Sequence, residues 1–93
     1  MRNTRFLNCV SFSGKDKDQE REFTYYRVAL YIENVNDKGQ ITDMKSKIVS
    51  CAKEVYEKVK TQGIKFGDKV IANTEIIERD DKQVEKVFDI AKA

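Results

Sequence analysis

The stretch from Phe23 to Ile32 alternates between two unlike sets of side chains, and this alternation constrains the fold more than any other feature. Read with a period of two residues, one set is Tyr26, Val28, Leu30 and Ile32. The other set is Phe23, Tyr25, Arg27, Ala29 and Tyr31. A period of two is typical of a β-strand, and the first set is what a strand turns toward a hydrophobic core. The stretch is therefore predicted to be a strand with Tyr26 pointing inward.

The second set is unusual, because three aromatic rings and one arginine stand where a half-buried strand ordinarily turns polar side chains to water. Rings interleaved with a cation suit a surface that stacks on something flat and anionic, such as single-stranded nucleic acid. Aromatic residues are also common in cores. The alternative is therefore that a second layer, either a helix or a partner subunit, covers these rings.

Composition limits the chain to one small domain and to a narrow range of functions. Its 93 residues, of which 40% are apolar, can build a modest core. The net charge of +2 permits nucleic-acid binding without arguing for it, because phosphate neutralisation supplies most of the affinity of non-specific binders. No apolar run approaches the length of a membrane span, and the first residues open no signal peptide. We expect a cytoplasmic protein.

Catalytic and metal-binding residues are scarce. The chain has no histidine, which removes the commonest general base and the commonest metal ligand. Cys9 and Cys51 are its only cysteines, and two thiolates without imidazole do not close a zinc site. A disulfide between them is possible, but two small buried hydrophobic residues are favoured. With no P-loop glycines and no paired carboxylates in an apolar setting, we expect no enzymatic activity, no metal and no cofactor.

Two strands are predicted in the first third of the chain. The first is Arg5–Ser13, with Phe6, Val10 and Phe12 on one face. Asn8 is expected on that face too, either toward a base or pairing a backbone group. A polar segment, Ser13–Glu22, is expected to be a solvated loop. The second strand is Phe23–Val35.

The segment Ile41–Gln62 has two interpretations. It could be one helix that begins after Thr42, because its apolar residues also form a helical stripe. We favour a third strand over Lys45–Cys51, which has β-branched residues at its centre, followed by a short amphipathic helix over Ala52–Lys60.

The last third is predicted as a hairpin. Gly67 and Asp68 form a turn that opens a fourth strand within Lys65–Glu78. The pair Asp80-Asp81 is a tight polar turn, and Lys82–Ala91 is a fifth strand, with a terminal helix from Lys82 as the competing interpretation. Val84, Phe88 and Ile90 are expected to share one face of that strand.

This order of elements, with one helix between the third and fourth strands, resembles that of the OB-fold, a five-stranded barrel. The stretches Ile48–Val59 and Phe66–Asn73 also resemble single-stranded-DNA-binding proteins of the bacterial type, whose small relatives occur on phages and mobile elements. The resemblance implies one mainly β, OB-fold-like domain over residues 1–93. It further implies single-stranded DNA as the partner, a role in replication or recombination, and a homo-oligomer, either a dimer or a tetramer. Since the chain has no tryptophan, stacking would have to use tyrosine or phenylalanine.

The resemblance also implies where a single strand would lie, since OB-fold domains bind it across their second and third strands. The candidate rings are Phe23, Tyr25 and Tyr31. The candidate cations are Arg5, Arg27, Lys45, Lys47 and Lys69. Lys45 and Lys47 are two residues apart, so they share a face of their strand. The residues expected in the core instead are Phe6, Phe12, Tyr56, Phe66 and Phe88.

A second function class remains open on the same residues. Phe23, Tyr25 and Tyr31 could anchor an interface with a protein partner, because tyrosine and arginine are enriched at binding hot spots. In that case the chain would be a small protein-interaction module.

Overall fold

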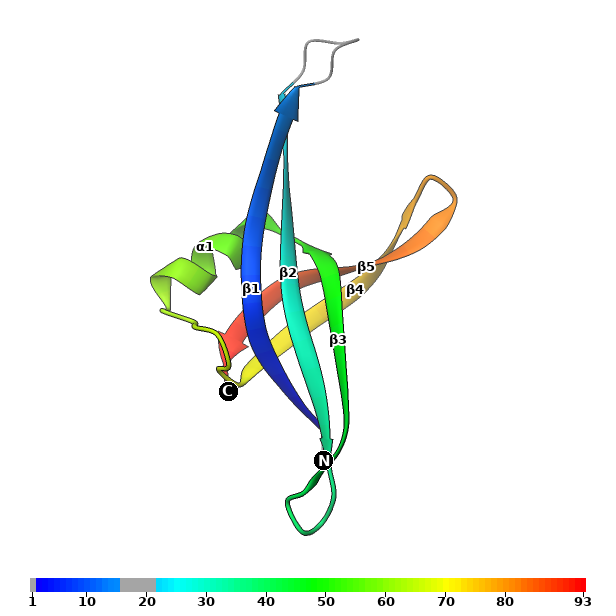
Figure 1. Ribbon diagram of the computed structural model, residues 1–93. Coiled ribbons are helices and arrows are strands. Elements are labelled where there is room, and N and C mark those ends of the chain that lie inside the picture. Colours follow the sequence, from blue (N-terminus) through cyan, green and yellow to red (C-terminus); the bar gives the residue numbers. More distant parts are fainter. Residues whose placement is uncertain (1, 16–21) are drawn as a thin grey trace.

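The protein is mainly β, as the sequence predicts. The computed structural model describes residues 2–15 and 22–93, except for the side chain of Arg79 (Figure 1). The elements are β1 (Arg2–Lys15), β2 (Glu22–Val35), β3 (Ile41–Cys51), α1 (Lys53–Thr61), β4 (Val70–Arg79) and β5 (Lys82–Lys92). The favoured division of Ile41–Gln62 into a strand and a helix is confirmed, and so is a strand at the C-terminal end.

One five-stranded sheet, in the order β1-β2-β3-β5-β4, contains all the strands. The strands β1, β2 and β3 form an antiparallel meander, and β4 pairs with β5 as a hairpin. The two parts meet where the end of β3 runs parallel to β5, at Ser50 and Cys51. Figure 1 shows β4 and β5 crossing the direction of the three long strands.

The sheet is not closed into a barrel, although its two end strands approach each other at one point. An isolated antiparallel bridge joins Arg5 of β1 to Lys69, just before β4. Beside it, the N–H of Phe6 donates to the carbonyl of Asp68 at 2.9 Å, and the N–H of Gly67 donates to the carbonyl of Phe6 at 2.7 Å. Gly67 has a φ of 88°, a conformation that glycine adopts without strain. The predicted Gly67-Asp68 turn thus holds the start of β4 against β1.

The hydrophobic core lies between the meander and the β4–β5 hairpin. Its buried residues are Phe6, Val28, Leu30, Cys51, Val55, Ile64, Val70, Val87 and Ile90. Val28 and Leu30 of β2 are fully covered, and Tyr26 packs against the same cluster. The predicted register of β2 is therefore confirmed, with Tyr26 on the core side.

The helix α1 closes one side of the core. It begins after Ala52, whose N–H donates to the carbonyl of Val87 at 3.0 Å and whose backbone is extended. Val55 is fully buried, and Val59, one turn later, packs against the core, as the amphipathic pattern predicts. Gly63, with a φ of 62°, follows the last turn and lets the chain leave the helix. Tyr56, expected in the core, is half-buried, with its ring 5.2 Å from that of Tyr26.

Two bulges break the alternation of side chains and overturn part of the predicted core. In β1 the register slips between Phe6 and Asn8, so that Phe6 points into the core while Phe12 points away from it and is 52% exposed. In β5 the pairing slips at Phe88, so that Val87 and Ile90 both reach the core. Phe88 is left 39% exposed, and Phe66, in the loop before β4, is 76% exposed. Of the four phenylalanines expected in the core, only Phe6 is buried there.

The segment expected to be a polar loop, Ser13–Glu22, is only partly described. Residues 13–15 and Glu22 belong to the two strands, so β1 and β2 continue well past the core. Residues 16–21 lie outside the described part of the chain.

Candidate functional site

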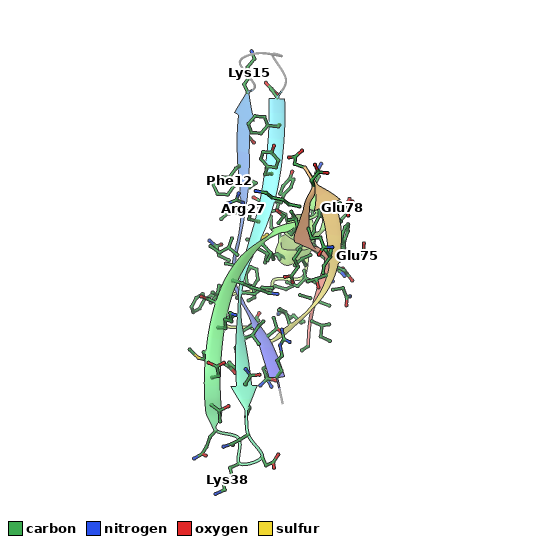
Figure 2. The ribbon with its side chains drawn as sticks, turned by 90° about the vertical axis from the view of Figure 1, so that its right-hand side faces the viewer. Phe12, Lys15, Arg27, Lys38, Glu75 and Glu78 are labelled. Atoms are coloured by element: carbon green, nitrogen blue, oxygen red, sulfur yellow. The ribbon has the colours of Figure 1, made fainter. Side chains whose placement is uncertain are left out.

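The surface of interest is the face of β1, β2 and β3 that points away from the core, called here the outer face. Residues directly opposite each other on neighbouring strands share a face, so the strand register defines its members. They include Asn8, Val10, Phe12, Phe23, Tyr25, Arg27, Ala29, Tyr31, Met44, Ser46, Ile48 and Ser50. Figure 2 shows Phe12 and Arg27 at the same height on the β1–β2 hairpin, with Lys15 near its tip and Glu75 and Glu78 on β4.

Three neighbouring rings on this face form what is called here the aromatic strip: Phe12, Phe23 and Tyr25. Phe12 lies directly opposite Tyr25 across the two strands. The ring centroids of Phe23 and Tyr25 are 5.1 Å apart, with the ring planes tilted by 47°. The exposed fractions are 52% for Phe12, 40% for Phe23 and 46% for Tyr25. The strip therefore presents ring surface to solvent over both strands of the hairpin.

Gly14 gives Phe23 its place in the strip. The two residues are directly opposite each other, and a Cβ on Gly14 would lie 2.5 Å from Cζ of Phe23. A ring can lie across β1 at this height only because glycine has no side chain there. A larger residue at Gly14 would push Phe23 out of the strip.

Arg27 is the cation that the structure places among the rings. Its guanidinium carbon lies 5.7 Å from the ring centroid of Phe12, within range of a cation–π interaction. The side chain is exposed, and none of the ion pairs found among the described residues involves it. Its charge is therefore available to a ligand on the outer face.

Next to the strip is a hollow of about 170 Å³ over Ala29. Its walls are Asn8, Val10, Phe12, Arg27, Ala29 and Ile48. Ala29 stands between Asn8 and Ile48 in one row across the three strands. Because alanine carries only a methyl group, it leaves space between its two larger neighbours in this row.

Tyr31, the third predicted ring, lies on the outer face farther along β2 and is half-buried. Arg5 is opposite it on β1, but the charge of Arg5 is already engaged. Its Nε lies 3.1 Å from Oε1 of Glu33, a carboxylate that is only 6% exposed, and its Nη1 donates to the carbonyl of Gly67 at 3.0 Å. Lys69, bridged to Arg5, is exposed. The contacts of Arg5 therefore hold the fold together at the approach of β1 to β4.

Lys45 and Lys47 share a face, as expected, but the structure does not bring them to the outer face. They stand opposite Ile32 and Leu30, on the core side of the sheet. Nζ of Lys47 lies 2.7 Å from Oε1 of Glu85 on β5. Lys45 is exposed near the end of the meander. The predicted basic stripe is thus divided between two faces.

Sequence reasoning missed Phe12, Val10 and Ile48 as members of this site. One signal could have found Phe12: pairing the strands outward from the polar loop sets Gly14 against Phe23 and Phe12 against Tyr25. Asn8 shares the outer face with Val10 but not with Phe6, and its Oδ1 accepts the N–H of Cys9 at 2.9 Å.

The two cysteines form a separate pair on the core side. Their sulfur atoms are 3.9 Å apart and both thiols are free. A hydrogen bond with Cys51 lowers the pKa of Cys9, whereas the same bond together with burial raises the pKa of Cys51. Within the described residues, no group of three or more histidine, cysteine, aspartate or glutamate side chains could hold a metal ion.

In the described part of the chain, no helix has the length and apolar character needed to cross a membrane. Comparison of the sequence and the fold with protein-family models, curated proteins and solved structures finds no match. The case for a function therefore depends on the geometry of the outer face.

Proposed function

We propose that this chain is a non-enzymatic protein that binds single-stranded DNA across the outer face, using the aromatic strip and Arg27. The observation that carries the proposal is the placement of Phe12, Phe23 and Tyr25 as neighbouring, half-exposed rings beside an exposed arginine that has no ion pair among the described residues. Base stacking on the rings would supply the affinity, and Arg27 would contact the phosphate backbone.

The energetics suit a chain of low net charge. A base stacked on an aromatic side chain contributes roughly 1–3 kcal/mol, whichever base it is, since every base has a π-face. Two or three stacked bases would then supply roughly 2–9 kcal/mol. Binding of this kind tolerates many sequences and depends on salt less steeply than binding by a strongly basic protein.

The fold supports the same proposal. The strand order, the helix between β3 and β4 and the bridge from Arg5 to Lys69 are what a partly open OB-fold barrel would have. In such barrels the outer surface of the second and third strands receives oligonucleotides. A role in replication or recombination of a phage or mobile element, and assembly into a dimer or tetramer, belong to the proposal through the sequence resemblance.

The test is fluorescence anisotropy with a labelled oligo-dT at several salt concentrations. Phe12→Ala and Tyr25→Ala should each weaken binding by roughly 5- to 150-fold, with little change in the salt dependence. Arg27→Ala should lower the slope of log affinity against log salt by about one.

Two matched controls lie off the outer face. Phe66→Ala removes a ring that is 76% exposed in the loop before β4, and Lys45→Ala removes an exposed cation from the opposite side of the sheet. Both variants should bind oligo-dT as the unaltered protein does. No binding at low salt, or equal losses in Phe66→Ala and Phe12→Ala, would contradict the proposal.

A second candidate function is an interface with a protein partner on the same face. It is favoured by Met44 and Ile48, which are 60% and 70% exposed on the outer face and give it an apolar character. Met44→Lys separates the two functions. The added cation should tighten oligo-dT binding and steepen its salt dependence, whereas a protein interface would lose an apolar contact and weaken.

A further inference from the structure

The hollow over Ala29 is the part of the outer face that stacking alone does not explain. Its volume of about 170 Å³ is smaller than the roughly 300–1,000 Å³ of an ordinary small-molecule pocket. Its floor is the methyl group of Ala29, and its apolar walls come from Val10 and Phe12 on β1 and Ile48 on β3. A space of this size suits one flat ring.

Among the polar groups at its rim, donors outnumber acceptors. Oδ1 of Asn8, which lines the hollow, uses one of its two lone pairs to accept the N–H of Cys9, and the NH2 group of the same amide keeps two donors. The guanidinium of Arg27 donates and has no acceptor atom. The other four side chains that line the hollow are apolar. Only the second lone pair of Asn8 Oδ1 remains as a side-chain acceptor at the rim, so a ring that offers mainly acceptors is better satisfied here than a ring that offers an amino group.

Nucleobases differ in this respect. Thymine offers two carbonyl oxygens, a methyl group and a single ring N–H, whereas adenine, cytosine and guanine each carry an exocyclic amino group with two N–H donors. A buried amino group without an acceptor costs free energy, and a methyl group gains from contact with Val10 or Ile48.

We infer that the hollow over Ala29 is a pocket for one thymine of the single strand, recognised by the amide of Asn8, with Arg27 at the rim next to the phosphate backbone. The inference rests on the proposed function and adds a base preference at one position of the bound strand. Phe12 and Arg27 border both the aromatic strip and the hollow. A strand stacked along the strip is thereby led to place its next base over Ala29.

The experiment compares the affinities for oligo-dT, oligo-dC and oligo-dA of equal length. The unaltered protein should prefer oligo-dT to oligo-dC by roughly threefold to tenfold, the effect of one or two neutral hydrogen bonds. Ala29→Leu should fill the hollow and bring the ratio of the affinities for oligo-dT and oligo-dC close to one. Ser46→Leu adds the same apolar side chain to the outer face outside the hollow and should preserve the ratio. Base stacking within the free oligonucleotides cancels when the affinity ratios of two variants are compared, because every variant is tested with the same three oligonucleotides.

Asn8→Asp supplies an independent test at an exposed position, so it decides the matter if Ala29→Leu fails to fold. The carboxylate still accepts the N–H of Cys9 but replaces the donating NH2 group with an acceptor. The preference should then shift from oligo-dT toward oligo-dC. Equal affinities of the unaltered protein for all three oligonucleotides, or a ratio unchanged by Asn8→Asp, overturns the pocket and leaves stacking intact. Failure to bind any of them overturns the proposed function itself.

Discussion

At the scale of single residues, one contact can decide what a charged side chain does. The sequence places Arg5 among the candidate DNA contacts, but its guanidinium is held by Glu33 and by the carbonyl of Gly67. Glu33 is 6% exposed, so its carboxylate has lost most of its water. A buried carboxylate keeps its charge at an acceptable cost only while a partner offsets it.

Replacing Arg5 should therefore reduce the free energy of unfolding more than it affects ligand contacts. Arg5→Met leaves Glu33 without its partner and should cost about 2–4 kcal/mol, measured by urea denaturation. Lys45→Met is the matched control, an exposed cation whose loss should change stability by less than about 0.5 kcal/mol. Equal effects of the two substitutions would show that Arg5 does not hold the fold.

The cysteine pair should react unequally. Because a hydrogen bond with Cys51 lowers the pKa of Cys9, Cys9 should hold more thiolate near neutral pH than an isolated cysteine does. Cys51 is buried and its pKa is raised, so in the native protein a thiol reagent should label Cys9 alone.

The pH dependence of labelling checks this assignment. Cys51→Ala removes the hydrogen bond, which should raise the pKa of Cys9 and move the midpoint of its labelling rate to higher pH. Cys9→Ala should leave the native protein almost unlabelled. A midpoint that moves to lower pH in Cys51→Ala would mean that burial, and not the hydrogen bond, controls Cys9.

At the scale of elements, the turn-forming residues predicted the order of the strands and the helix well. The two β-bulges limited the prediction of which face each side chain occupies. Each strand is recognisable in the sequence because it is a run of alternating β-branched or aromatic residues with turn-forming residues on both sides. The bulges at Leu7 and Phe88 have no comparable signal in the sequence, because each bulged residue is apolar like its neighbours in the strand. One slip at each site reverses the face of every later side chain in that strand. That reversal is why Phe12 was expected in the core and is on the outer face.

A single substitution in the β4–β5 turn is predicted to increase the stability of the protein. Asp80 and Asp81 have φ angles of 52° and 63°, the left-handed conformation that a two-residue type I′ turn requires. Glycine adopts this conformation more readily than aspartate. Asp81→Gly should therefore raise the free energy of unfolding by about 0.5–1 kcal/mol.

The converse change serves as its control. Gly39 has a φ of 79° in the β2–β3 connection, and a Cβ there would meet nothing within 4 Å. Gly39→Ala should consequently lose a similar free energy through backbone strain alone. If both substitutions change the urea midpoint in the same direction, left-handed strain does not govern these turns.

At the scale of the whole molecule, the length of the β1–β2–β3 meander explains which parts of the site could be foreseen. The faces of β2 were predictable because Val28 and Leu30 meet the core. The face of Lys45 and Lys47 was not, because β3 places lysines on its core side, so its hydrophobic pattern does not distinguish the two sides of the strand. Lysines there lie on the core side, while Met44 and Ile48 are exposed on the other. Pairing with β2, and not hydrophobicity, sets that face.

The long strands of the meander also make the molecule elongated, which X-ray scattering in dilute solution can check. Its Cα radius of gyration is 15.4 Å, with extents of 56 × 32 × 16 Å. A compact domain of this length would have a radius of about 12 Å. We expect a single copy to scatter with a radius near 15.4 Å. A value near that of a compact domain would mean that the β1–β2 hairpin folds back onto the core and covers the outer face.

The outer face has a practical consequence for handling the protein. Phe12, Met44 and Ile48 turn apolar surface to water on one side of a thin molecule, while a net charge of +2 gives little repulsion between copies. Concentrated samples should therefore become turbid by contact through this face. Under the proposed function, a short oligonucleotide bound over it would act as a solubilising additive, because it hides the apolar surface.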